Sequence, residues 1–568
     1  MRPIVLIKKR DTPRKVYKPI LKDSNSWPVV QMSKKRDEFV KLVLEESYEN
    51  LVDQPRGRTL REELEMTTYR EKMRIKDNPW KVDPKDDYDF WNNIQVKLVE
   101  SETLEKEDAI KVQNGLLKEI TARYADEIAG KFKPSSFRFV RNIVTMGFAR
   151  LLNTARVRGP WSLLSNQLDL DDKIDITGHP NELRKLARQG TIVMVPTHFS
   201  NLDSVLIGWV IQFLGLPPFI YGAGLNLWNL KIFAYFMNSV GAYKLDRRKK
   251  NPIYLETLKT YSTIALREGC HSLFFPGGTR SRSGKIEKAL KLGLLGTAIE
   301  AQRQIYQSET TEEGKKLFIV PVTINYHFVL EAPSMVNDYL KLKGQERYYV
   351  ENDEFTTSFK ISKFLMKFFT RGSGISVTIG KGMDVLGNYV DENGSSIDKQ
   401  GQIIDPRDYF KTDGIITEDK QREQQYNRIL GKKLVKEFHK NNRVFSSHLL
   451  AFTAFRMIGK KHEKLDLYSL LRLSDEDSII SYQDLYDHVK IVYNQLEVLK
   501  ESGEVGFASH LTEDIDVIIQ HGLKNLGMYH AQPPLAKLKS KDIKIENMNL
   551  LYFYHNRLVG YGLEKLFK

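Results

Sequence analysis

Cysteine is almost absent from this sequence, since Cys270 is the only one among 568 residues. A single cysteine excludes an intrachain disulfide and a cysteine-rich metal site, and it is typical of a reducing compartment. The histidines do not have the spacing of a metal-binding motif, so no metal ion is expected. Cys270 lies where a helix pattern meets a strand pattern, and we expect it to be a small buried side chain.

Long hydrophobic runs are missing as well. The nearest candidate, residues 204–228, is interrupted by Pro217 and Pro218 and is better explained by a buried helix, a turn and a buried strand. A membrane-spanning helix needs about 20 apolar residues, and the first residues lack the apolar core and cleavage site of a signal peptide. We therefore expect a protein that is soluble or lies on a membrane without spanning it.

The charge of the chain is unbalanced: 87 lysines and arginines stand against 72 acidic residues, a formal net charge of +15. Such a chain favours acidic partners, which are nucleic acids, anionic lipid surfaces or phosphorylated metabolites. The hydrophobic fraction of 41% and the charged fraction of 28% exclude a disordered acidic chain, a collagen-like chain and a polytopic membrane protein. The positive charge is spread along the chain without a nucleic-acid-binding signature, so nucleic acid is not the expected partner.

The periodicity of apolar residues divides the chain into three regions. Residues 1–130 form an expected helical region without a nucleotide or metal motif, and residues 391–568 are expected to be mostly helical. Between them, residues 131–390 alternate short β-branched or aromatic runs with helical patterns, which predicts an α/β core with a central mixed sheet covered by helices. The expected strands are 191–197, 219–222, 242–246, 271–276, 317–326 and 375–380. Pro321 suggests that its strand is an edge strand or carries a bulge.

The first candidate site follows the first of these strands. His198 is expected on a loop, and Asp203, five residues later, at the start of a helix. If the chain folds back there, the Asp203 carboxylate reaches the imidazole, holds one ring nitrogen as N–H and leaves the other able to act as a general base. Alternatively, Asp203 forms a capping box with Ser200 and only satisfies backbone N–H groups. The two roles are compatible, because a carboxylate has several lone pairs.

The second candidate site, residues 274–285, follows another strand and precedes an expected helix over 286–301. It is not a P-loop, because five residues instead of four separate Gly278 from Gly284 and Ile286 stands where that motif needs serine or threonine. The glycine turn and the helix N-terminus would form an anion cradle; the alternative is a solvated basic turn. Its cations suit a phosphate monoester: Arg280, Arg282 and Lys285.

Four motifs occur in one order along the chain: His-x-x-x-x-Asp at 198–203, Gly-Ala-x-x-x-Asp-Arg at 241–247, Phe-Pro-x-Gly-Thr-Arg-Ser-Arg at 275–282 and Val-Pro-Val at 320–322. Together they resemble the glycerolipid acyltransferase family, whose members transfer an acyl chain from acyl-CoA or acyl carrier protein to glycerol-3-phosphate or a lysophospholipid. The similarity covers about 190–330. Two later segments are similar to the glycerol-3-phosphate and dihydroxyacetone-phosphate branch: 442–448 and 551–558.

The resemblance implies a role for each matching residue. His198 would deprotonate the acceptor hydroxyl, Asp203 would orient His198, and the acceptor oxygen would attack the thioester directly. The acyl thioester is a co-substrate, and no cofactor is implied. Pro321 would shape the pocket, and the acceptor would be bound by the residues of the middle motifs: Arg247, Gly278, Thr279, Arg280 and Arg282.

Two departures from the family pattern affect the choice of acceptor. Gly277 stands where the family usually has a glutamate, and Leu245-Asp246-Arg247 is similar to lysophosphatidate acyltransferases. The total length and the later segments favour the larger branch, so we expect acylation of glycerol-3-phosphate, the first step of phospholipid synthesis. Acylation of 1-acylglycerol-3-phosphate is the alternative. A basic nucleic-acid-binding protein or a non-catalytic lipid-binding protein is more remote, and the retention of His198 and Asp203 argues against the latter.

An enzyme of this kind meets its lipid product at a bilayer, so the resemblance implies a cytoplasmic protein bound peripherally to the inner face of the membrane, without a transmembrane helix. Residues 359–371 combine apolar residues at helical spacing with a stripe of cations, which is typical of a helix lying on an anionic membrane surface. Residues 137–158 are a second candidate. The alternative for both is a core-packed helix with solvated cations. The expected membrane contacts are Lys363, Phe364, Lys367, Phe368 and Phe369.

Overall fold

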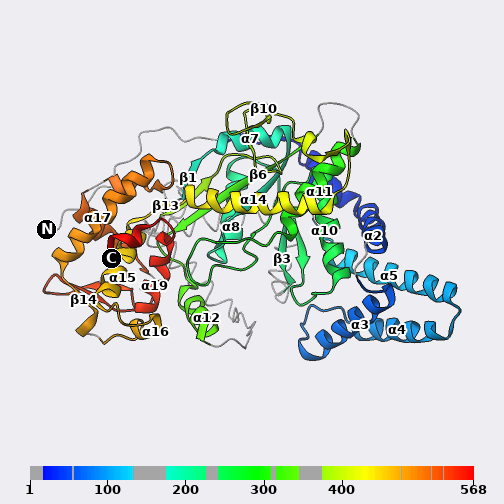
Figure 1. Ribbon diagram of the computed structural model, residues 1–568, viewed down its shortest axis with the longest axis horizontal. Coiled ribbons are helices and arrows are strands. Elements are labelled where there is room, and N and C mark those ends of the chain that lie inside the picture. Colours follow the sequence, from blue (N-terminus) through cyan, green and yellow to red (C-terminus); the bar gives the residue numbers. More distant parts are fainter. Residues whose placement is uncertain are drawn as a thin grey trace, which may run out of the picture.

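A seven-stranded sheet forms the centre of the computed structural model (Figure 1), with strands in the order β1-β7-β6-β2-β5-β3-β4. The structure describes residues 17–53, 57–130, 132, 174–225, 241–308, 315–344, 374–474, 476–512, 514–528 and 530–567. All neighbouring strands are parallel except β6 and β7, so the sheet is mixed, as expected. The strands are β1 Ile174–Gly178, β2 Gly190–Pro196, β3 Ile220–Gly224, β4 Ala242–Leu245, β5 Ser272–Leu273, β6 Lys316–Tyr326 and β7 Ile375–Ile379.

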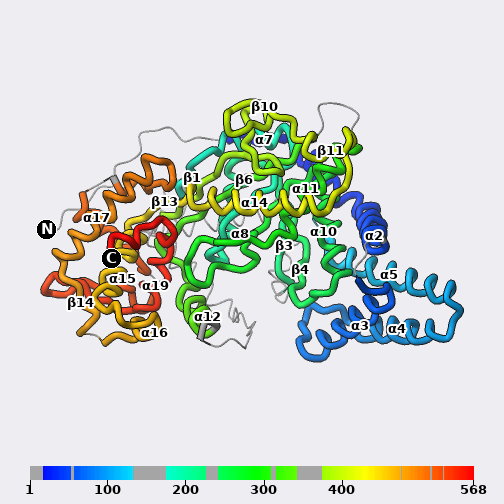
Figure 2. Tube along the Cα trace, viewed as in Figure 1, coloured from blue at the N-terminus to red at the C-terminus, as the bar shows by residue number. Residues whose placement is uncertain are grey.

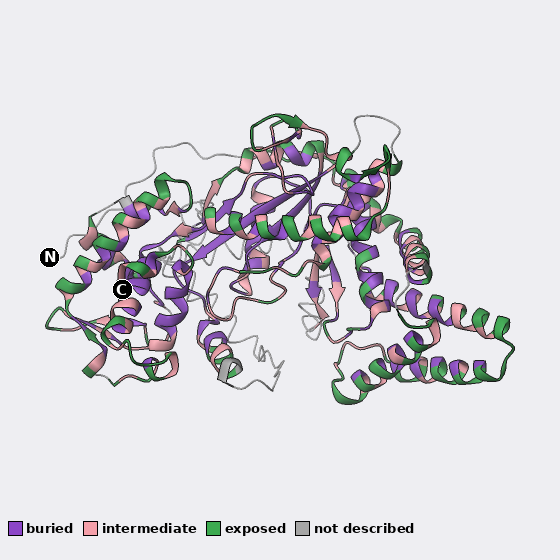
Figure 3. Ribbon diagram, in the orientation of Figure 1, coloured by how far each residue is buried: buried purple, intermediate pink, exposed green. Residues whose placement is uncertain are grey.

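The six strands expected from apolar runs are all present in the sheet. Strands β2 and β6 lie at its centre, and every residue of β2 after Gly190 and of β6 after Lys316 is buried (Figure 3). Burial of both faces explains their uninterrupted apolar sequence. The strand β1, Ile-Asp-Ile-Thr-Gly, was not expected, because three of its five residues are only partly buried and its apolar pattern is short.

Pro321 lies in β6, which has a neighbour on both sides, so the interpretation as an edge strand is wrong. On the β7 side, Val322 pairs with Ile379, whereas Ile319 pairs with Met383. Between these two pairs the chain advances three residues along β6 but four residues along the partner segment, 379–383. The partner segment therefore has one extra residue, which is a β-bulge next to Pro321. The bulge interpretation is confirmed, and the missing N–H of Pro321 falls where the ladder is already interrupted.

Helices flank the sheet, and α14 crosses in front of it in Figure 1. Contacts with β6 come from α7, α11 and α14, and α10 packs against α11. These helices bury one face each against the apolar strands, which is the layered arrangement expected of an α/β core. The helices are α7 Pro180–Gln189, α8 Leu202–Phe213, α10 Pro252–Arg267, α11 Gly293–Ser308, α12 Ala332–Gly344 and α14 Lys420–Lys440.

The N-terminal helices pack against α10 and the β4 end of the sheet through a second hydrophobic cluster. Its largest members are Trp91, Tyr124 and Tyr243, which are fully buried. Cys270 belongs to the same cluster and is 1% exposed, so the expectation of a small buried side chain is confirmed. These helices are α1 Pro28–Lys34, α2 Arg36–Asp53, α3 Leu60–Asp77, α4 Asp87–Glu100 and α5 Lys106–Ile128.

The C-terminal helices lie at the opposite end of the sheet from α2–α5 (Figure 2) and join the main hydrophobic cluster of the core. They are α15 Ser446–Lys461, α16 Leu467–Leu470, α17 Tyr482–Glu501, α18 Ile515–Asn525 and α19 Met548–His555, followed by the 3₁₀ helix η9 Asn556–Leu558. Short strands lie between these C-terminal helices: β14 Ile479–Ile480, β15 Gly506–Phe507, β16 Leu535–Lys537 and β17 Ile543–Ile545. Strand β13 Arg443–Val444 precedes α15. Other short strands lie between β7 and α14: β8 Tyr389–Val390, β9 Ser396–Ile397, β10 Ile403–Ile404, β11 Lys411–Thr412 and β12 Ile415–Ile416.

Across the described ranges, each helix is too short or too polar to cross a bilayer. The interfacial segments expected at 137–158 and 359–371 lie outside the described residues and stay predictions. The same holds for their expected membrane contacts, Lys363, Phe364, Lys367, Phe368 and Phe369.

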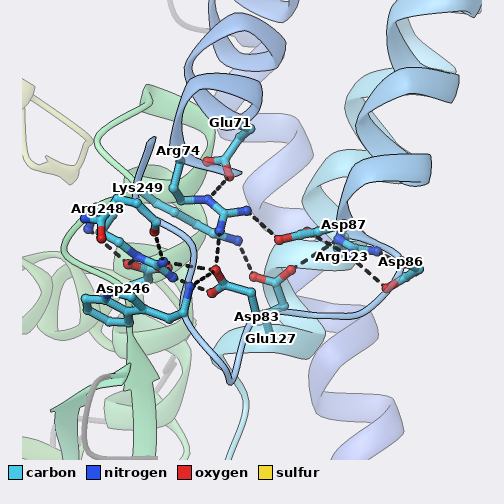
Figure 4. A network of polar contacts seen from close by, with 12 residues as sticks. Glu71, Arg74, Asp83, Asp86, Asp87, Arg123, Glu127, Asp246, Arg248 and Lys249 are labelled. Atoms are coloured by element: carbon cyan, nitrogen blue, oxygen red, sulfur yellow. Dashed lines mark hydrogen bonds and ion pairs between the residues drawn. The ribbon is translucent and has the colours of Figure 1, made fainter. Parts of the chain in front are cut away.

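A buried ionic network joins the N-terminal helices to the turn after β4 (Figure 4). At its centre, Arg74 of α3 donates to Glu71 at 2.7 Å and to Asp87 at 2.5 Å. Burial disfavours the charged guanidinium, but these two carboxylates outweigh it and raise the pKa of Arg74 above its usual value. Asp83 forms ion pairs with both Arg74 and Arg248, at 3.2 and 2.5 Å. The network also includes Asp86, Arg123, Glu127, Asp246 and Lys249.

The network fixes the conformation of residues 246–249, which begin with the last two residues of the second sequence motif, Asp246 and Arg247. Arg248 donates to the carboxylate of Asp246 at 2.7 and 2.9 Å, and Lys249 pairs with Glu127 of α5. The N-terminal helices therefore brace the turn that carries Arg247.

Replacing Arg74 by alanine should lower the free energy of unfolding by about 3–5 kcal/mol, because buried carboxylates lose their cation. Arg61→Ala is a matched control on the same helix, since its pairs with Glu65 and Glu102 are more exposed and should contribute about 1 kcal/mol or less. Urea denaturation of both variants measures the difference. Equal losses would contradict the role given to the buried network.

Candidate active site

The candidate residues lie in the loops at the carboxyl ends of the parallel strands. His198 follows β2, and the glycine turn follows β5, which is its neighbour. The two loops are in contact, because the N–H of Ser281 donates to the carbonyl of His198 at 2.8 Å and the ring of Phe275 stacks on the imidazole at 4.1 Å. The first and third sequence motifs are thus brought together.

Arg247 lies on the same edge but not beside His198. Its turn follows β4, three strands from β2 in the sheet, which corresponds to about 14 Å at the usual spacing of strands. Arg247 is exposed, whereas the next residue, Arg248, points into the ionic network. Of the two arginines, only Arg247 is therefore exposed at the surface of this edge.

His198 and Asp203 form a hydrogen-bonded pair. His198 lies on the loop and Asp203 in the first turn of α8, so the chain folds back, and His198 Nδ1 is 2.9 Å from Asp203 Oδ2. The same Oδ2 accepts from the N–H groups of Phe199 and Ser200, at 2.6 and 2.9 Å. Asp203 thus contacts the imidazole and satisfies backbone donors at once, as the two compatible interpretations require. This geometry leaves His198 Nε2 to accept a proton.

Tyr326, the last residue of β6, holds the other oxygen of the same carboxylate. Its hydroxyl donates to Asp203 Oδ1 at 2.5 Å. Burial, together with the negative charge of Asp203, raises the pKa of Tyr326 well above its usual value, so the phenol stays a donor. Asp203 itself is 0% exposed. No motif pointed to Tyr326, because its partner is more than 100 positions away.

Arg557 reaches this site from η9. It is buried, its guanidinium lies 4.0 Å from the centre of the Phe199 ring, and it donates to Asn442 Oδ1 and the carbonyl of Ile324 at 2.9 and 2.6 Å. Burial lowers the pKa of Arg557 to about 10, so it remains a cation at neutral pH, with Asp203 among the negative charges near it. The segments 442–448 and 551–558 therefore contribute directly to the surroundings of the pair.

The glycine turn differs from its expected form, because α11 begins at Gly293 and not at 286. Gly284 has a positive φ of 80°, and a Cβ there would lie 2.3 Å from the carbonyl oxygen of Phe553. The chain turns at this contact, and residues 285–292 return to the glycine turn, where Lys291 N–H donates to Pro276 O at 2.7 Å. The expectation that the helix N-terminus forms the anion cradle is wrong.

The returning loop brings two charged side chains against the glycine pair. A Cβ on Gly277 would lie 3.0 Å from Glu287 Oε1, and a Cβ on Gly278, whose φ is 73°, would lie 2.9 Å from Lys291 Nζ. Both glycines therefore make room for side chains from positions 287 and 291. Residues 287 and 291 were not predicted as site residues, because the apolar pattern placed them in a helix over 286–301. The one sequence signal for them was Gly277, which stands in place of the family glutamate.

The carboxyl group of Glu287 lies beside the backbone of the His198 loop. Its Oε1 accepts from His198 N–H at 3.4 Å, and its Oε2 is buried without a hydrogen-bond partner among the described residues. Burial raises the pKa of Glu287 to about 7, against the opposing effects of backbone N–H groups and Arg557, while Asp203 adds to the rise.

The cations of the turn have different surroundings. Arg280 Nη1 lies 3.6 Å from Glu331 Oε1, and Glu331 also accepts from Ser200 Oγ and Asn201 N–H, at 3.0 and 2.9 Å. Arg280 is thereby tied to the loop of the histidine. Arg282 is half-buried, and within the described ranges no carboxylate or carbonyl is hydrogen-bonded to it. That geometry leaves its guanidinium available to an anion.

The remaining predicted residues lie at the margin of the site. Thr279 is exposed at the tip of the turn. Pro321 is buried within β6 at the level of Val195, three residues before His198, and its carbonyl accepts from Gly380 N–H at 2.8 Å. Pro321 therefore supports the strand beneath the site.

A cluster of three histidines lies in the C-terminal region: His327, His510 and His521 each offer an atom within 4.8 Å of the others. The N–H of Ser446 donates to His510 Nε2 at 3.0 Å, which places the proton of this ring on Nδ1. His510 thus has no lone pair left for a metal ion, and the cluster does not fit one.

Part of this chain is similar in sequence to known acyltransferases. Residues 179–325 match the family model described as Acyltransferase. The glycerol-3-phosphate acyltransferase of Aeromonas hydrophila is 28% identical over 272 residues, which are 48% of this chain and 29% of that protein. The enzyme of the same name from Haemophilus influenzae is 30% identical over 249 residues, 43% of this chain and 27% of that protein. The matches thus span less than a third of the length of these relatives.

The contribution of Glu287 to stability should decrease as the pH rises. Its pKa is about 7 in the folded chain against an ordinary value of 4.5, so the folded state binds this proton more tightly than the unfolded chain does. The resulting stabilisation, at most about 3 kcal/mol, is present below pH 4.5 and is lost as the pH rises through 7.

Glu287→Gln cannot ionise, so its free energy of unfolding relative to the parent should be higher at pH 8 than at pH 5. Urea denaturation at the two pH values measures this, with the exposed Glu268→Gln as a control that should show no such change. Parallel pH profiles for the parent and Glu287→Gln would contradict the raised pKa.

Proposed function

Since this chain belongs to the glycerolipid acyltransferase family, we propose that it transfers a fatty acyl chain from an acyl thioester to a hydroxyl of glycerol-3-phosphate. The observation that carries the proposal is the contact between the His198–Asp203 pair and the basic glycine turn. A general base lies there next to cations that suit a phosphate, and the acceptor needs both.

The reaction follows from the arrangement of the pair. His198 Nε2 takes the proton of the acceptor hydroxyl while the oxygen attacks the thioester carbon. The new C–O bond forms, the C–S bond breaks, and the proton passes from the imidazolium to the leaving thiolate. Asp203 keeps the proton on Nδ1 and stabilises the imidazolium. Acyl-CoA and acyl carrier protein are both donors of this chemistry.

The acceptor phosphate is assigned to the cations around the glycine turn. Arg282 lies on the turn and Lys291 on the loop against it, where Gly278 leaves room for the Lys291 side chain. Arg280 contributes its charge while it holds Glu331. Arg247 lies further along the same edge, so its side chain would have to extend toward β2 to share the phosphate.

Acyl transfer to a lipid precursor also implies a membrane. We propose that the chain meets an anionic surface through residues 359–371, with Phe364, Phe368, Phe369, Lys363 and Lys367 in contact. The support is the helical spacing of apolar residues in this sequence, beside a stripe of cations.

The proposal is tested by offering labelled palmitoyl-CoA to the purified protein with glycerol-3-phosphate, dihydroxyacetone phosphate or lysophosphatidate, and again with an acyl-carrier-protein donor. Lysophosphatidate as the product of glycerol-3-phosphate is expected. His198→Ala should lower kcat by about 100-fold or more, because general-base catalysis is lost. The exposed His179→Ala is the control and should retain activity.

The outcomes separate the alternatives. Phosphatidate as the only product would assign the chain to the lysophosphatidate branch. Absence of transfer from either donor to any of the three acceptors would contradict the proposal, and substantial turnover by a folded His198→Ala variant would contradict the role of the base.

Arg282→Ala should raise the KM for the acceptor about tenfold or more and leave the KM for the donor nearly unchanged, because a charge-assisted hydrogen bond to the phosphate is lost. Lys288→Ala, an exposed cation of the adjacent loop, is the matched control for the change in overall charge. An unchanged acceptor KM in Arg282→Ala would exclude Arg282 from the phosphate site.

A further inference from the structure

The carboxyl group of Glu287 has an unused hydrogen-bonding position at the candidate active site. Oε2 is buried without a hydrogen-bond partner in the described part of the chain, whereas Oε1 contacts the backbone N–H of His198. A buried polar atom without a partner is unfavourable and calls for an explanation, such as a ligand that completes it. The terminal torsion of a glutamate is broad, so either oxygen can turn toward such a ligand.

The position of this carboxyl group depends on Gly277. The nearest atoms to a Cβ on Gly277 would be Glu287 Oε1 at 3.0 Å and Cγ at 3.2 Å. Any side chain at 277 would compete with Glu287 for the same space. Glycine at 277 and glutamate at 287 therefore act as a pair, and the carboxylate enters the site from the returning loop and not from the strand end.

We propose that Glu287 binds the second hydroxyl of a diol acceptor and so selects a hydroxyl over a ketone at the carbon next to the reacting one. The proposal rests on the proposed function, in which the reacting hydroxyl is bound at His198. The carboxyl group of Glu287 lies against the backbone N–H of His198, on the loop that carries the base. In this proposal it receives the hydroxyl on the carbon next to the reacting one.

The selectivity follows from hydrogen-bonding capacity. At pH 8, above its pKa of about 7, Glu287 is ionised. A carboxylate only accepts hydrogen bonds, so it pairs with a hydroxyl but is opposed to a ketone oxygen, which also only accepts. Glutamine has nearly the same shape, but its amide can both donate and accept. Glu287→Gln therefore removes the discrimination between the two acceptors while it keeps the volume of the side chain.

The experiment compares kcat/KM at pH 8 for glycerol-3-phosphate and for dihydroxyacetone phosphate, with palmitoyl-CoA as the common donor. The parent should prefer glycerol-3-phosphate, and Glu287→Gln should reduce this preference about tenfold or more, because a hydrogen bond to a charged group is lost. The KM for palmitoyl-CoA should not change. Lys288→Gln, on the neighbouring residue of the loop, is the control and should keep the preference of the parent.

A reciprocal variant tests the pairing of positions. Glu287→Gly combined with Gly277→Glu returns a carboxylate to the same space from the other side, and it should restore part of the lost preference. A purely structural role for Glu287 would lower both kcat/KM values equally, and an unchanged ratio in Glu287→Gln overturns the proposal.

A second measurement does not need turnover. Glycerol-3-phosphate should raise the Tm of the parent more than that of Glu287→Gln, and equal shifts overturn the proposal. If the parent transfers an acyl chain to none of the acceptors, the proposed function fails. If the parent is active but does not prefer glycerol-3-phosphate over dihydroxyacetone phosphate, only the role of Glu287 fails.

Discussion

The carboxylate of Asp203 is completely buried, and the surrounding structure is organised to supply its donors. Two backbone N–H groups of its own loop, the imidazole of His198 and the hydroxyl of Tyr326 contact it. Such a group is costly to bury unless every lone pair finds a donor or a cation. The end of β2, the start of α8 and the end of β6 must therefore take fixed positions, and the imidazole of His198 is held in one orientation.

Each helical region braces one of the loops that follow the strands. The N-terminal helices hold the turn after β4 through Arg74 and Arg248, and the C-terminal region supplies Arg557 beside the loop after β2. Both braces are arginines in low-dielectric surroundings, where their interactions with carboxylates are stronger than in water. The loops after β4 and β2 are thus held by buried arginines from the two ends of the molecule, whereas the sheet itself is held by apolar packing.

Local patterns were sufficient to predict six strands and the geometry of the His198–Asp203 pair. In each case the information lies within a few residues: an apolar run for a strand, and a loop followed by a helix start for the pair. The start of α11 was mispredicted because Ile286 and the residues after it fit a helical period, while the turn at Gly284 is imposed by Phe553, far along the chain. Tyr326 and Arg557 were missed for the same reason, since their partners are distant in sequence.

The place of Arg557 in the chain has a consequence for synthesis. It is added to the growing chain 354 positions after Asp203, which corresponds to roughly 20–70 s at ordinary rates of translation. During that interval the carbonyl of Ile324 and the ring of Phe199 lack the guanidinium that contacts them in the folded chain. The centre of the molecule can therefore close only late, and a chaperone that shields the unfinished sheet would act mainly in this interval.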